Sequence, residues 1–222
     1  MKTNWTLPRD QPFDYQLAMD RLRGFQSPRD KLGHLCERGE VVRVKKGLYL
    51  PGWRWGEEGP VDPLVLASLI YGPSYVSLET ALSLHGLIPE RTEEITCVTL
   101  KRAKCFDTPV GRYRYVPVNE RAYACGIRLE TGRGGAYFLA EPEKALCDRI
   151  ALVRSLTTVR EVGAVLEADL RIERSSLRRI VGEIRVGLVA DIAERYRRRN
   201  VSVFHRWLVR EFGADRNLLL PS

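Results

Sequence analysis

The first part of the chain shows two short stretches with helical periodicity. Residues 14–23 repeat apolar side chains at helical spacing, and a glycine follows them. The next stretch, "SPRDKLGHLCERG", begins with Ser27, a favoured N-cap residue, and ends at Gly39, a favoured helix stop. The pattern therefore predicts two helices before residue 40.

The pattern changes to alternation in residues 40–51, "EVVRVKKGLYLP", which is typical of a β-hairpin. If the loop is Lys45-Lys46-Gly47, the glycine supplies the left-handed turn residue. The apolar pairs then share one face, which we expect to pack on the two helices, and the lysines lie at the tip. The implied pairs are Val44 with Leu48, Arg43 with Tyr49, and Val42 with Leu50.

A Gly/Pro-rich segment at 51–63 predicts a domain boundary. The fold class expected is α+β. An N-terminal winged helix-turn-helix over residues 1–52 precedes a mixed α/β domain over 60–222. That second domain has a core at about 60–153, with a small, mainly antiparallel sheet, and a helical C-terminal part at about 154–222. Helices are expected at 63–70, 77–86, 141–153, 158–169, 174–184, 186–199 and 201–213, and strands at 94–101, 111–118, 126–131 and 136–140.

The charge is concentrated at the two ends of the chain. The net charge is +8, divided as +5 over residues 1–56, −3 over 57–170 and +6 over 171–222. A basic excess at both ends favours a polyanionic partner. The five cysteines lack CxxC spacing, so neither a disulfide framework nor a zinc site is expected. With no apolar run near the ~20 residues of a membrane span and no signal-peptide pattern, we expect a cytoplasmic protein without membrane contact.

Motifs for enzymatic chemistry are missing from the sequence. None of the seven lysines has an acidic residue two positions earlier, so the metal-dependent nuclease signature does not occur. Neither a phosphate-binding G-x-x-x-x-G-K nor a G-x-S-x-G or HExxH motif is present. We expect no enzyme, cofactor or metal. The acidic residues Glu141, Glu143 and Asp148 are interpreted as structural, with Glu143 and Lys144 as a surface pair.

The predicted helix and hairpin carry cations suited to duplex DNA. A winged helix inserts a helix into the major groove and lays its hairpin on the adjacent backbone. Asp30 and His34, on the exposed helix face, are the candidate base readers, and Tyr49 shares the outer hairpin face. The candidate phosphate contacts are Ser27, Arg29, Lys31, Arg43, Lys45 and Lys46.

A second group of cations lies near the C-terminus, in "ERYRRRN". Helical rotation of about 100° per residue spreads these side chains around the cylinder, so they form no single stripe. They could meet phosphate, RNA or an acidic protein, or form a solvated helix end. The four arginines are Arg195, Arg197, Arg198 and Arg199.

Three segments together resemble the AbiEi-type antitoxin family, the transcriptional-regulator half of bacterial type IV toxin–antitoxin systems. They are "SPRDKLGHLCERGEVVRVKKGLYLP", "DPLVLASLIYGPSYVSLETALSLHGLIPE" and "FLAEPEKALCDRI", in that order. The resemblance implies a winged helix that binds inverted repeats in its own promoter. It also implies a following domain that counteracts a nucleotidyltransferase-like toxin encoded next door.

The expected function is therefore that of an antitoxin and transcriptional autorepressor. The expected partners are double-stranded operator DNA, a cognate nucleotidyltransferase-like toxin and a second protein copy on a palindromic site. Whether the toxin is touched directly stays open at this point. One alternative is a protein-interaction module that neutralises a toxin by direct binding without DNA, and another is an enzyme that acts on nucleic acid.

Overall fold

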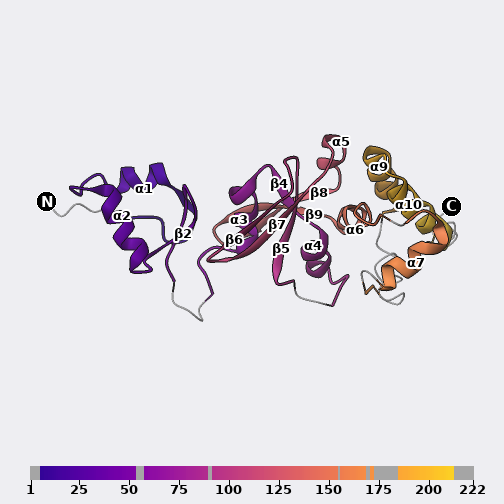
Figure 1. Cartoon of the computed structure of the whole chain (residues 1–222), viewed down its shortest axis with the longest axis horizontal. Coiled ribbons are helices and arrows are strands. Elements are labelled where there is room, and N and C mark those ends of the chain that lie inside the picture. Colours follow the sequence, from indigo (N-terminus) through magenta and orange to yellow (C-terminus); the bar gives the residue numbers. More distant parts are fainter. Residues whose placement is uncertain are drawn as a thin grey trace, which may run out of the picture.

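The computed structural model describes residues 6–53, 58–89, 92–154, 156–168, 171–172 and 185–212. The molecule is elongated, with an N-terminal unit, a central sheet and a group of C-terminal helices arranged in chain order along its long axis (Figure 1). Helices together with one antiparallel and one mixed sheet make it an α+β protein, as predicted. Within the described residues, no helix combines the length and the apolar character needed to cross a membrane.

The N-terminal unit packs two helices on a three-stranded sheet. Both predicted helices are confirmed, and the strand β1, which the sequence analysis missed, adds to the hairpin in the order β1-β3-β2. Asp14 caps the first helix, because its Oδ1 accepts a hydrogen bond from the amide of Leu17 at 2.7 Å. The elements are β1 (Phe13–Asp14), α1 (Tyr15–Leu22), α2 (Pro28–Glu37), β2 (Val41–Lys45) and β3 (Leu48–Pro51).

The hairpin register is partly as predicted. Val42 pairs with Leu50 and Arg43 pairs with Tyr49, but Leu48 pairs with Lys45 and not with Val44. The register shifts between Arg43 and Lys45, so Val44 is the extra residue of a β-bulge. The turn therefore shortens to Lys46-Gly47, and Gly47 takes the left-handed conformation with φ 85°.

The hairpin lies between two hydrophobic cores. Tyr49 faces the small core of the N-terminal unit, whereas Val44, Leu48 and Leu50 belong to the main core of the protein. The expectation that the apolar hairpin pairs pack on the two N-terminal helices is therefore wrong. Alternation sorts side chains onto two faces, but it cannot say which neighbour covers each face when both faces are covered.

The central sheet is mixed. Over the residues that the structure describes, it has six strands in the order β6-β7-β5-β4-β9-β8. The β4–β9 and β5–β7 pairs are parallel and the other three pairs are antiparallel, so the description as mainly antiparallel holds only narrowly. The strands are β4 (Ser74–Val76), β5 (Glu94–Thr99), β6 (Lys104–Thr108), β7 (Gly111–Pro117), β8 (Ile127–Gly132) and β9 (Gly135–Ala140).

The helices that accompany this sheet continue the main core toward the C-terminus. The predicted helix at 174–184 lies outside the described residues, and the short α5 was not predicted. One hydrophobic cluster runs from Val44 in the hairpin to Leu208 in the last helix. The helices are α3 (Pro63–Tyr71), α4 (Leu78–Leu84), α5 (Glu120–Tyr123), α6 (Pro142–Ile150), α7 (Val159–Ala168), α9 (Val186–Tyr196) and α10 (Arg199–Phe212).

Candidate nucleic-acid interface

A groove of about 550 Å³ lies between the two N-terminal helices and the hairpin. Three cations from different elements meet in it: Arg29 from the first turn of α2, Arg43 from β2 and Lys46 from the turn. Among the described residues, no acidic side chain lines the groove. The remaining lining residues are Tyr15, Leu32, Gly33, Cys36, Gly47 and Tyr49.

The start of α2 supports this arrangement of charge. Ser27 has the extended backbone of an N-cap, as predicted, but its hydroxyl accepts no capping hydrogen bond. The Ser27 hydroxyl therefore does not bond to the first-turn N–H groups of α2, which begin at Arg29 because Pro28 has none. These groups attract anions in the same way as the side-chain cations do.

Two residues expected on the outer surface of the hairpin have other roles. Tyr49 is only 6% exposed and its ring stacks on Phe13 with centroids 5.9 Å apart, and it also lines the groove. Lys45 was expected at the tip, but its Nζ donates a hydrogen bond to the carbonyl oxygen of Ile70 at 2.6 Å. Lys45 therefore ties the hairpin to the C-terminal end of α3. Its pKa is lowered, first by partial burial and then by nearby lysines.

The other predicted residues of α2 lie outside the groove lining. His34 Nδ1 is 3.2 Å from Glu37 Oε2, and both side chains are exposed. Asp30 is also exposed, whereas the Lys31 ammonium lies 5.0 Å from the centre of the Phe25 ring. The exposed face of α2 is therefore mixed in sign, in contrast to the groove.

A further cationic cluster, which the sequence analysis missed, lies between β5 and β6. The ammonium groups of Lys101 and Lys104 lie 5.1 and 5.8 Å from the centre of the Tyr71 ring, and Arg102 between them is exposed. Tyr71 directly follows Ile70, whose carbonyl oxygen accepts the hydrogen bond from Lys45, so the cluster lies beside the hairpin. The segment "KRAK" carried the signal, but the net negative charge of residues 57–170 concealed it.

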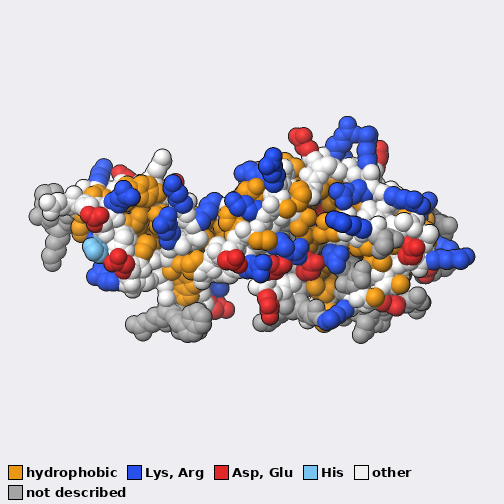
Figure 2. Space-filling model, viewed as in Figure 1, with side chains coloured by type: hydrophobic (Ala, Val, Ile, Leu, Met, Phe, Trp, Pro, Cys, Tyr) orange, Lys and Arg blue, Asp and Glu red, His pale blue; other side chains and the backbone are white. Residues whose placement is uncertain are grey.

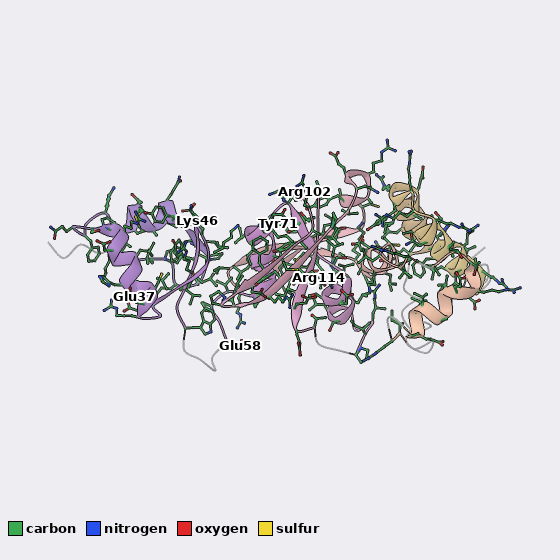
Figure 3. The ribbon with its side chains drawn as sticks, viewed as in Figure 1. Glu37, Lys46, Glu58, Tyr71, Arg102 and Arg114 are labelled. Atoms are coloured by element: carbon green, nitrogen blue, oxygen red, sulfur yellow. The ribbon has the colours of Figure 1, made fainter. Side chains whose placement is uncertain are left out.

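The groove and this cluster belong to one basic side of the molecule. Lys46, Tyr71 and Arg102 lie along the same side of the ribbon (Figure 3). On this side, lysine and arginine side chains extend from the N-terminal unit, across the narrow part of the molecule, onto the central sheet (Figure 2). We call the cations of the groove together with Lys101, Arg102 and Lys104 the basic strip.

The arginines on β7 do not add to the basic strip, because carboxylates neutralise them. Arg114 contacts Glu94 at 2.6 Å and Glu79 at 3.0 Å, and Arg149 from α6 contacts Glu79 at 3.0 Å. Arg112 lies 3.5 Å from Glu94. This network ties the sheet to α4 and α6 and has a structural role.

The four C-terminal arginines do not form one cationic surface. Arg198 donates a hydrogen bond to the carbonyl oxygen of Ala151 at 2.9 Å, which fixes it against the end of α6. Arg199 opens α10. Arg195 and Arg197 line a cleft of about 300 Å³ that also contains Arg121, Asp191 and Glu194, so the charge there is mixed.

The acidic residues of α6 lie in a buried polar cluster. Glu143 and Lys144 are both buried, so the expectation of a surface pair is wrong. Lys144 Nζ contacts Asp148 Oδ1 at 2.9 Å and donates to the carbonyl oxygen of Ala122 at 2.7 Å. Asp148 also accepts hydrogen bonds from the hydroxyl groups of Tyr75, Ser77 and Tyr196.

This cluster has no room for a substrate. The cavity beside Asp148 measures about 20 Å³, close to the space of one water molecule. The cluster joins β4, α5, α6 and α9, which supports the structural interpretation of Asp148. In the described part of the chain, no group of three or more His, Cys, Asp or Glu side chains could hold a metal ion.

Comparisons of the sequence with models of known protein families and with curated proteins find no match.

Proposed function

We propose that this protein is a DNA-binding transcriptional regulator whose N-terminal unit acts as a winged helix. In this proposal α2 enters the major groove and the hairpin lies on the adjacent phosphate backbone. The observation that carries the proposal is the groove between these two elements, whose described lining holds Arg29, Arg43 and Lys46 and no acidic side chain. A surface of one sign beside a helix N-terminus suits a polyanion.

The position of the hairpin extends the proposed interface beyond the N-terminal unit. Lys45 bonds to Ile70 and the hairpin packs in the main core, so the wing is fixed to the central sheet. The cluster of Lys101, Arg102 and Lys104 then meets the same backbone. Because these cations contact phosphate, they add affinity without reading sequence.

We further propose that the regulator is an antitoxin that represses its own operon. The support is the ordered resemblance of three segments to AbiEi-type antitoxins. In this proposal the C-terminal domain counteracts a nucleotidyltransferase-like toxin, and the protein acts in the cytoplasm without enzymatic activity.

A fluorescence-anisotropy titration tests the DNA proposal. The probe is a labelled duplex from directly upstream of the gene, with a scrambled duplex beside it, over a series of salt concentrations. The double variant Arg43→Ala/Lys46→Ala should lower the slope of log affinity against log salt by about two units, because each phosphate contact contributes about 0.9. An unchanged slope would mean that Arg43 and Lys46 do not contact phosphate, so the groove would not be part of the interface.

A matched control removes two cations elsewhere. Arg121 and Arg195 lie in the mixed-charge cleft beside α9. The double variant Arg121→Ala/Arg195→Ala lowers the net charge by the same amount as the groove variant. It should leave the slope within about half a unit of the wild-type value. An equal loss for both variants would mean that only total charge matters.

Direct toxin binding without DNA is the second candidate function. The exposed face of α2, with Asp30, His34 and Glu37, is mixed in sign, which favours a protein partner for that face. Co-purification with the product of the neighbouring gene, together with no preference for the upstream duplex, would select this candidate.

A further inference from the structure

Among the described residues, no strand pairs with the outer edge of β8 in the central sheet. This strand stands last in the order β6-β7-β5-β4-β9-β8. The amide of Glu141 donates a hydrogen bond to the carbonyl oxygen of Gly126 at 2.9 Å. Gly126 and Glu141 therefore form a hydrogen-bonded cross-strand pair of the β8–β9 ladder. Because such pairs alternate along an antiparallel ladder, Arg128 and Glu130 bond toward β9. The N–H and C=O groups of 127, 129 and 131 therefore point away from the sheet.

The exposed face of this edge is apolar at its centre. Leu129 is 64% exposed and its cross-strand partner Phe138 is 45% exposed. On the other face of the strand, Arg128 Nε lies 2.6 Å from Glu130 Oε1. The centre of β8 thus carries a leucine flanked by one cation and one anion.

We propose that β8 pairs antiparallel with β8 of a second copy of this chain, about a twofold axis that passes beside Leu129. This register places Arg128 of each copy opposite Glu130 of the other, so both cross-strand charge pairs are attractive. Leu129 meets Leu129, and Ile127 meets Thr131. The three outward N–H groups of each copy would together donate six hydrogen bonds, and the two sheets would become one.

The opposite edge of the sheet does not have this self-complementarity. In β6, Thr108 pairs with Gly111 across a two-residue turn, so the outward backbone groups belong to Cys105 and Asp107. Antiparallel self-pairing about Phe106 would place Lys104 opposite Thr108, with no charge pair. A lysine on an edge strand also discourages pairing. The geometry therefore selects β8 as the edge that receives a second copy.

Sedimentation equilibrium without DNA tests this inference, so its failure is separate from a failure of the DNA proposal. One chain has a mass of 25.4 kDa, and the weight-average mass should rise toward twice that value with concentration. Leu129→Pro removes an outward N–H that the β8–β9 ladder does not use, and it should weaken dimerisation at least about tenfold. Leu129→Thr keeps that N–H and serves as the control.

Charge reversal tests the register. Arg128→Glu and Glu130→Arg each place like charges opposite one another in the dimer, so each variant alone should dimerise about tenfold more weakly. An equimolar mixture of the two should recover dimers, because position 128 and position 130 then carry opposite charges across the interface in both cross-strand pairs. Circular dichroism checks that each variant is folded.

Three outcomes would overturn the proposal. The first is a wild-type protein that stays at the monomer mass across the concentration range. The second is a wild-type dimer that Leu129→Pro leaves intact. The third is a pair of folded charge-reversal variants whose mixture stays monomeric.

Discussion

Gly33 offers a direct test of the groove, because it lies in the middle of α2 and lines the groove. Apart from the adjacent residues and the backbone of α2 itself, a Cβ atom built at this position meets no atom within 4 Å. A side chain can therefore be added without a clash with α1 or the hairpin. Substitutions at Gly33 can therefore change the stability of the helix and the charge of the groove independently.

The expected magnitudes follow from the helix and from the three cations. Replacing a helical glycine by alanine stabilises a helix by about 1 kcal/mol, so Gly33→Ala should raise the free energy of unfolding by that amount. Gly33→Glu should stabilise by about 0.5 kcal/mol, because glutamate is a weaker helix former than alanine. Its carboxylate would oppose one of the groove cations, which lowers the salt slope by about 0.9. Affinity near 0.1 M salt then falls about tenfold.

Two measurements on the same proteins decide the outcome. Urea unfolding gives the stability of each variant, and anisotropy titration with the upstream duplex gives affinity and salt slope. Gly33→Gln is the matched control, since it has the size of glutamate without the charge. If the glutamate and glutamine variants bind DNA equally well, the phosphate backbone does not run through the groove. If Gly33→Ala destabilises the protein, the space above α2 is not open.

Two further predictions concern the buried face of α6. Lys144→Met should lower the free energy of unfolding by about 3–5 kcal/mol, because it leaves the Asp148 carboxylate buried without its cation. Unfolding in guanidinium measures this change, and a loss of less than about 1 kcal/mol would refute the prediction. Burial raises the pKa of Glu143, but hydrogen bonds from Arg185 outweigh burial, so its folded pKa is below the ordinary value. The stabilisation is therefore present above the ordinary carboxyl pKa and is lost as the pH falls through the lowered one. Glu143→Gln should remove this acid-dependent part of the stability curve, and curves of equal shape would contradict the assignment.

Helices and long strands were predictable because their patterns are local. The predicted 27–39 and 111–118 segments correspond to α2 and β7 within a few residues. The central strand β4 was missed because three residues are too few to show alternation. Its position depends on partners far along the chain, β5 and β9, which no local pattern reveals.

The candidate site was predictable in composition but not in geometry. Arg29, Arg43 and Lys46 were expected on one surface, and the structure brings them together in one groove. The alternating pattern predicts that Lys45 and Tyr49 lie on the outer surface. Sequence alone suggests that a hairpin packs on one face and leaves the other face in solvent. In the structure both faces of β3 are covered, whereas Arg43 and Lys46 stay exposed; the Lys45 side chain bonds to a helix end and Tyr49 fills a core.

The packing of β3 between two cores affects how the proposed DNA binding should behave. A wing on a flexible hinge would lose ordering entropy on each binding event, whereas this hairpin is already packed in two cores. The groove cations and Lys101, Arg102 and Lys104 then approach the backbone as one rigid set, without a second ordering step. Their contributions to the salt slope should add, because each site neutralises separate phosphates. If the hydrogen bond from Lys45 to Ile70 is lost, the groove cations and the cluster of Lys101, Arg102 and Lys104 should no longer bind as one rigid set. Each group would still keep its own charge.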